Sequence, residues 1–215
     1  MLRKLNAFLF LLCSFWFFIS SCKDTCSCKQ VPCPEYSNPE FDAWFPYDSG
    51  QVNIFSNGMT KDTITFLITY ISPAYEANKG CIHADNGCSM QKTIFSKEIN
   101  NTNATKFLCN WYSAADWEGN NTGISLQLLV QGFSLPPDGT YISDTGVVLN
   151  PNTGAFVSKY FSSLTLNGKQ FTSVQQIEYA APDTKTDNVY KIYIAKSAGL
   201  IGYEYYLSKE LWMKE

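Results

Sequence analysis

Apolar and polar stretches alternate along the chain from about residue 51 to its end. The apolar runs are rich in β-branched and aromatic residues, which suit a pleated, half-buried surface. Clusters of Asn, Gly, Pro and Asp separate them, and Asn167-Gly168 between two such runs is the strongest short-range signal for a β-hairpin. The pattern predicts strands at residues 51–56, 64–70, 91–96, 106–111, 124–133, 171–179, 189–195, 200–206 and 210–213.

The same pattern decides the fold class. No segment after residue 21 sustains an apolar period of 3.6 residues, so no crossover helices are predicted. Parallel strands need such crossovers, and we therefore expect an all-β domain at residues 44–215. Its twisted antiparallel sheet would form a sandwich, a half-barrel or a curled sheet. Residues 22–43, rich in Cys and Pro, are predicted to be a disordered tether.

The N-terminus has a different pattern. Arg3 and Lys4 precede an apolar run of about 13 residues, whereas a membrane-spanning helix needs about 20. A cationic start, a short apolar run and small residues indicate a secretory signal peptide at residues 1–21. The following Ile19-Ser20-Ser21-Cys22 resembles the lipobox of bacterial lipoproteins. This resemblance implies cleavage before Cys22 and its acylation, which would hold the mature protein durably on a membrane.

Two further segments resemble lipoproteins of Bacteroidota. Lys23-Asp24-Thr25 is similar to their surface-export signal except at Thr25, where a second acidic residue is expected. The pattern Tyr-x-Ala-Lys-x-x-Gly-Leu-Ile-Gly-Tyr at residues 193–203, with the aromatic-Pro-x-x-x-Gly segment at residues 45–50, resembles a group of small uncharacterised lipoproteins. The resemblance implies a twisted antiparallel sheet and a lipid-anchored place on the outer membrane, at the cell surface or the periplasmic face. It brings no catalytic residues.

Charge argues against some classes of partner. Without Arg3 and Lys4, the mature chain would carry 14 basic against 19 acidic residues, a net charge of −5. Arg3 is the only arginine, so a mature chain would lack the guanidinium groups that bind phosphate in a bidentate way. Nucleic acid is therefore not an expected partner.

Six cysteines remain after Cys13 and Cys22 are set aside, and an exported chain favours disulfides. Cys81 and Cys88 enclose a short loop with an Asn-Gly turn signal, so we expect them to pair. Cys109 is expected to bond one of the N-terminal cysteines, most simply Cys33. Cys26 and Cys28 stay open, either paired with each other or free.

Candidate chemistry is sparse. His83 is the only histidine, and metal binding there would need the thiols of Cys81 and Cys88 reduced, so no metal or cofactor is predicted. Asp116 and Glu118 are the nearest approach to a pair of catalytic carboxylates. Three aromatic residues precede a Gly/Asn-rich loop and are the candidate ligand-binding residues, with core packing as the alternative: Trp111, Tyr112 and Trp117.

The sequence thus predicts a non-catalytic envelope lipoprotein that binds or scaffolds, with the membrane, an envelope protein or a glycan as partner. One alternative is a carrier that holds a lipid or other apolar ligand in the curled sheet. The other is a carboxylate-dependent hydrolase.

Overall fold

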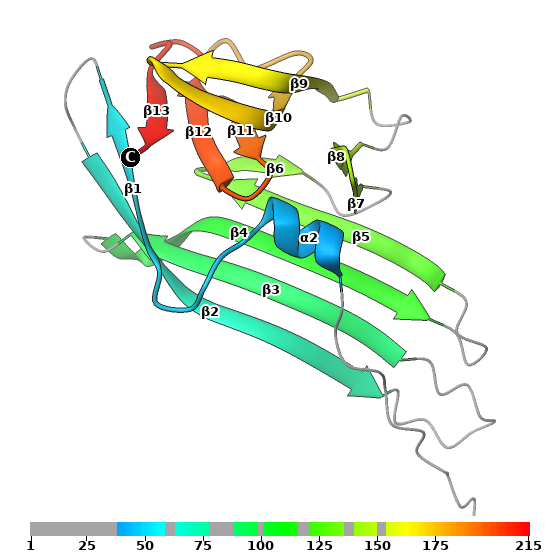
Figure 1. Cartoon of the computed structure of the whole chain (residues 1–215). Helices are drawn as coiled ribbons and strands as arrows, with labels where there is room; N and C mark the ends of the chain where they lie inside the picture. The colour runs from blue at the N-terminus through cyan, green and yellow to red at the C-terminus, as the bar shows by residue number, and fades with distance from the viewer. Residues whose placement is uncertain are drawn as a thin grey trace, which may run out of the picture.

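The computed structural model describes residues 38–58, 63–77, 88–98, 101–115, 121–135, 140–149 and 154–215. These residues form an 11-stranded antiparallel sheet, a separate two-stranded hairpin and a short helix (Figure 1). The large sheet is strongly curled into a half-barrel, which confirms the predicted all-β, curled antiparallel architecture. In the part of the chain that the structure describes, no helix is both long and apolar enough to cross a membrane.

The strand order joins the two ends of the domain. The sheet runs β6-β5-β4-β3-β2-β1-β13-β12-β11-β10-β9, so the first strand lies beside the last, with Phe55 opposite Lys214. The strands are β1 (Val52–Asn57), β2 (Thr63–Ala77), β3 (Cys88–Glu98), β4 (Asn101–Ala115), β5 (Asn121–Val130), β6 (Phe133–Leu135), β7 (Tyr141–Ser143), β8 (Gly146–Val148), β9 (Phe156–Leu166), β10 (Lys169–Tyr179), β11 (Val189–Ala195), β12 (Gly199–Tyr205) and β13 (Leu211–Lys214).

The curl brings the β6 edge of the sheet against strands near the opposite edge. The ring of Phe133 on β6 lies 5.6 Å from Phe156 on β9 and 4.8 Å from Tyr179 on β10. The Ser134 backbone N–H donates a hydrogen bond of 3.2 Å to the Tyr179 hydroxyl oxygen. A side chain therefore takes the place of a neighbouring strand at this point of the β6 edge.

Helix α2 (Pro39–Trp44) fills the concave side of the sheet (Figure 1). It starts where Asn38 accepts a hydrogen bond from the Phe41 N–H and where Pro39 occupies the first helical position, both of which favour a helix start. Phe41, Trp44 and Phe45 are 0% exposed. The expected tether boundary at residue 43 is thus too late, because residues 38–43 belong to the ordered domain.

The β7–β8 hairpin is held on the same side by a buried glutamine. The Gln175 side-chain amide on β10 accepts a hydrogen bond from the Val147 N–H and donates one to the Val147 carbonyl. It therefore bonds to Val147 as the backbone of a neighbouring strand would. Gly146 has a φ of +109°, and a Cβ there would lie 2.3 Å from Gln175 Oε1. Glycine is the residue that this close approach admits.

A second apolar cluster, here called the convex cluster, lies on the outer face of the C-terminal strands. Its buried members are Val174, Tyr193, Ala195 and Ile201. β10 pairs with β11 only from Val174 to Glu178, and Ser173 has a φ of +51°. Beyond it the β9–β10 hairpin covers this face, with Lys169 Nζ 3.2 Å from the Lys214 carbonyl on β13.

Two local predictions need correction. Residues 124–133 were predicted as one strand, but Gln131 and Gly132, with φ of +47° and +90°, turn the chain between β5 and β6. The predicted bond between Cys109 and Cys33 is not formed, since Cys109 is a free thiol, and Cys33 lies outside the described residues. Cys109 lies on β4, which pairs with β3 on one side and β5 on the other. Its side chain belongs to the concave core and is 0% exposed, and this burial raises the pKa of its thiol.

Candidate functional site

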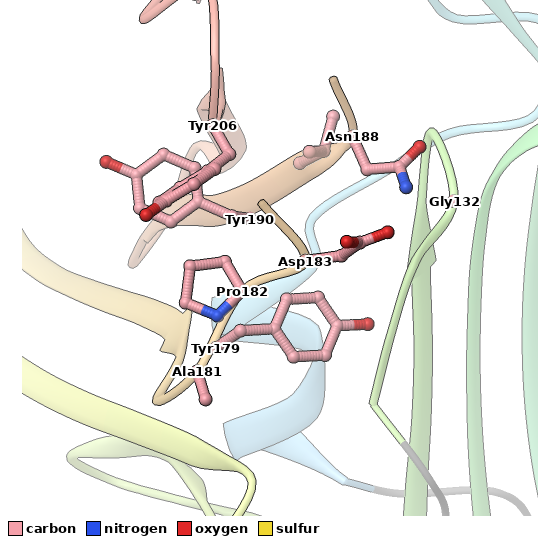
Figure 2. Close-up of a pocket in the computed structure, with 9 residues that line it drawn as sticks. Gly132, Tyr179, Ala181, Pro182, Asp183, Asn188, Tyr190 and Tyr206 are labelled. Carbon is pink, nitrogen blue, oxygen red and sulfur yellow. The ribbon is translucent and has the colours of Figure 1, made fainter. Parts of the chain in front are cut away.

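A pocket of about 290 Å³ opens where the β10–β11 loop meets the turns after β5 and β12 (Figure 2). The loop at residues 180–188 supplies one wall, and Gly132 in the β5–β6 turn supplies another. The pocket is lined by Gly132, Tyr179, Ala181, Pro182, Asp183, Asn188, Val189, Tyr190 and Tyr206. Segments far apart in the sequence therefore meet here because the sheet curls.

Three tyrosines give the pocket its apolar surface. Tyr179 is fixed by aromatic contacts on the concave side, with its ring 4.7 Å from Phe156. Tyr190 and Tyr206 meet edge to face, with ring centroids 5.2 Å apart at an interplanar angle of 80°. Such edge-to-face pairs are a preferred aromatic geometry, so these rings hold each other in place.

The polar side of the pocket is ordered by hydrogen bonds within the loop. Asp183 accepts from the Lys185 N–H at 2.9 Å and from the Thr186 hydroxyl at 2.6 Å. The Thr186 bond and then the Lys185 bond lower the pKa of Asp183, so this exposed carboxylate is ionised at neutral pH. The Asn188 side-chain N–H₂ donates to the Thr186 hydroxyl at 2.7 Å. The loop is thus shaped before any ligand arrives.

A second set of bonds ties this loop to the β12–β13 turn. Asp187 Oδ1 accepts from the backbone N–H groups of Leu207 and Ser208, at 2.8 and 3.1 Å. The Asn188 carbonyl accepts from the Tyr206 N–H at 3.0 Å. Asn188 and Tyr206, which line the pocket, are therefore held in fixed relation to each other.

Behind Tyr190 lies a charged network on the convex face. Glu204 accepts hydrogen bonds from the Tyr190 hydroxyl at 2.7 Å, from the Tyr193 hydroxyl at 3.3 Å and from Lys191 Nζ at 3.4 Å. Lys191 also lies 3.3 Å from Glu178. Burial raises the pKa of Tyr190, and the bond to Glu204 engages its hydroxyl, so Tyr190 offers the pocket its ring.

Several polar groups at the pocket remain able to bind a ligand. The Asn188 side-chain oxygen and the Tyr206 hydroxyl have no hydrogen-bond partner among the described residues. Asp183 keeps spare lone pairs, since a carboxylate accepts about four hydrogen bonds. Figure 2 shows the side chains of Asp183 and Asn188 directed to the same side. The arrangement offers stacking together with hydrogen bonds, which is the composition of a small-ligand site.

The pocket differs from the site that the sequence predicted. Trp111 and Tyr112 lie on β4, where their backbones face Leu126 and Ser125 on β5. Their side chains lie outside the described part of the structure, as does Trp117. Cys88 begins β3, with only its backbone described. Also outside the described residues lie Cys22, Cys26, Cys28, Cys33, Cys81, His83, Asp116 and Glu118.

Sequence reasoning missed the pocket although a signal was present. The segment Pro182-Asp183-Thr184-Lys185-Thr186-Asp187-Asn188 is a long polar loop between two clear strands, and tyrosines flank it on both sides. Loops on a rigid scaffold carry a large share of binding sites. Among the described residues, no group of three or more His, Cys, Asp or Glu side chains lies close enough to hold a metal ion.

Comparisons with known proteins identify no family for this chain. No family model matches it, and neither a curated protein nor a solved structure matches it at a significant level.

Proposed function

We propose that this chain is a non-catalytic lipoprotein of a bacterial outer membrane that binds a neutral sugar unit in the pocket at the β10–β11 loop. The observation that carries the proposal is a cavity of about 290 Å³ that is lined by tyrosine rings together with Asp183 and Asn188. The lipobox-like residues 19–22 support the anchored location. The loop bonds that fix the pocket support recognition without a large rearrangement.

A sugar suits this combination of groups. The C–H face of a pyranose packs on aromatic rings, and its hydroxyls donate to carboxylate and amide oxygens. The charge of Asp183 disfavours an anionic ligand, and Lys209, whose Nζ lies 4.2 Å from the Tyr206 ring centroid, offsets that charge only in part. A neutral saccharide is therefore favoured over a phosphate or an acidic peptide.

The two alternative functions have less support. A carrier needs an open apolar cavity, but the helix on the described concave side places Phe41, Trp44 and Phe45 there with 0% exposure. The hydrolase hypothesis rests on Asp116 and Glu118, which lie outside the described residues. A pocket wall with one carboxylate, Asp183, gives binding contacts rather than an acid–base pair.

The test uses the full chain purified in detergent and an array of neutral mono- and oligosaccharides, followed by calorimetry on any sugar that binds. Tyr206→Ala and Asp183→Ala should each weaken binding by at least tenfold, because each removes a contact in the pocket. Tyr141→Ala is the matched control, since Tyr141 is 41% exposed and lies on β7 outside the pocket. Absence of binding to all sugars, or equal affinity in the pocket variants, would refute the proposal.

The anchored location has its own measurement. Mass spectrometry of the N-terminal peptide should find acyl groups on Cys22 and no residues before it. An unmodified thiol there, or residues 1–21 still attached, would overturn this half of the proposal while leaving the sugar-binding half intact.

A further inference from the structure

β9 is an open edge of the sheet, in contrast to β6 at the other end of the strand order. β9 has 11 residues, whereas β6 has three and places Ser134 against the Tyr179 hydroxyl. Among the described strands, β9 is the outermost and pairs with β10 alone, so half of its backbone N–H and C=O groups point away from the sheet. Among the described residues, no backbone group of residues 156–166 bonds beyond that ladder.

The sequence of β9 has few of the features that usually protect an edge. Proteins discourage edge-to-edge pairing with proline, charged side chains such as lysine, or very short strands. The strand Phe-Val-Ser-Lys-Tyr-Phe-Ser-Ser-Leu-Thr-Leu contains no proline and a single charge, at Lys159. Val157 and Tyr160 are about half exposed, at 49% and 48%. Such a strand is a template for pairing with another strand.

We propose that two copies of this chain pair through their β9 strands in an antiparallel, two-fold arrangement that continues the sheet from one copy into the other. The strand is compatible with itself in this arrangement. A two-fold axis near Phe161 or Ser162 sets Lys159 opposite a neutral residue between Ser163 and Thr165 of the second copy, because its single charge lies in the first half of the strand. Like charges directly opposite would be destabilising, and this pairing avoids them.

A second copy fits this edge better than a charged peptide does. Apart from Lys159, the exposed groups on β9 are aromatic, β-branched or hydroxyl side chains, and cross-strand pairs of these types stabilise antiparallel sheets. An isologous pair presents the same groups from both sides. Anchoring by a lipid would raise the local concentration of both copies and favour the dimer further.

The first experiment changes the charge on the exposed side of β9 and measures mass by sedimentation equilibrium of the full chain in density-matched detergent. The double variant Ser163→Lys with Thr165→Lys places lysines opposite Lys159 of the second copy, and we expect the dimer dissociation constant to rise at least tenfold. Lys159→Glu alone should stay dimeric. The triple variant, which combines Lys159→Glu with both lysines, should regain the dimer through opposite charges.

Because the changed side chains are all exposed, we expect the substitutions to leave the fold of each copy intact. The unfolding midpoint of each variant checks this expectation. A monomeric wild type overturns the proposal, including the case in which residues 22–37 of the same chain cover the edge. A double variant that dimerises as well as wild type also overturns it, because the pairing would then lie elsewhere.

A second measurement places the axis. Ser162→Cys should form a disulfide-linked dimer under mild oxidation if the axis lies at Ser162, because position 162 then lies opposite position 162 of the second copy. With the axis at Phe161, position 161 faces itself, and Phe161→Cys should form the cross-link instead. Thr172→Cys is the matched control, since Thr172 is also exposed but lies one strand further in, on β10. Equal cross-linking of Thr172→Cys and of both β9 variants would count against the proposed pairing.

Discussion

The two faces of the C-terminal strands are both apolar, but they are covered in different ways. The concave face is covered by helix α2, by β6 and by the β7–β8 hairpin, and its core includes residues from most strands of the sheet. The convex cluster has four buried residues and is covered by the β9–β10 hairpin. One face thus depends on the whole fold, whereas the other depends on a single supersecondary unit.

This difference has a geometric origin. The curl of the sheet lets strands from both ends reach the concave side, as the contact of Phe133 with Tyr179 shows. The convex side is covered by the β9–β10 hairpin, which bends back over it. The bend lies at Ser173, which has a positive φ and is where β10 stops pairing with β11. The comparison predicts global loss of stability for damage on the concave side and more local loss on the convex side.

The largest effect is expected for Trp44→Ala in the concave core. Trp44 is 0% exposed, and truncation of a buried aromatic costs about 3–5 kcal/mol in free energy of unfolding. Its indole Nε1 makes no hydrogen bond among the described residues, so the loss would come from packing. Urea denaturation measures the change, and Tyr141→Ala, at a 41% exposed position, should shift stability by less than about 1 kcal/mol. A loss at Trp44 as small as that of the control would contradict the concave core as described.

A smaller and more local effect is expected for Ile201→Ala in the convex cluster. Ile201 is 0% exposed, but the hairpin over it can settle into the cavity, so we expect a loss of about 2–3 kcal/mol. The hairpin should also open more often, which lets trypsin bind the backbone around Lys169, whose side chain is already exposed near the turn.

Native-state proteolysis provides the comparison. Cleavage after Lys169 should rise in Ile201→Ala relative to other sites, whereas Trp44→Ala should raise cleavage at all sites together. If both variants raise cleavage uniformly, the two faces unfold as one unit and the distinction between them fails.

The sequence predicted the features that are encoded locally. The Asn167-Gly168 turn joins β9 to β10 with positive φ at both residues, as the hairpin signal requires. The consecutive strands β11 and β12 were likewise predicted, at residues 189–195 and 200–206. Strand alternation and turn chemistry act within about ten residues, so one sequence suffices to find them.

The sequence did not predict features that depend on distant contacts. Helix α2 has six residues, too few to show an apolar period, and the core contacts of Phe41 and Trp44 stabilise it. The candidate pocket combines Gly132, Asp183 and Tyr206, which only the curl of the sheet brings together. No periodicity in one sequence carries that information.

The smallest effect concerns buried tyrosines, which occur on both faces. Burial raises the pKa of Tyr193 in the convex cluster to about 12, and it raises the pKa of Tyr47 in the concave core as well. A raised folded-state pKa gives stability that is complete below the unfolded value of 10.0 and is lost as the pH rises through the folded value. Stability should therefore fall above about pH 10, and Lys214, whose pKa burial lowers, acts in the opposite direction.

Tyr193→Phe tests the convex face, because it removes the contribution of Tyr193 alone. The other groups with shifted pKa values, Tyr190, Lys191, Tyr47 and Lys214, stay in place. The variant should lose less stability than wild type between about pH 10 and 11 while it still shows some decline, which urea midpoints measured from about pH 8 upward would reveal. Identical slopes would mean that Tyr193 ionises as freely in the folded chain as in the unfolded one. The β9–β10 hairpin would then fail to exclude water from the face that it covers, and the convex cluster would be a loosely covered surface rather than a second core.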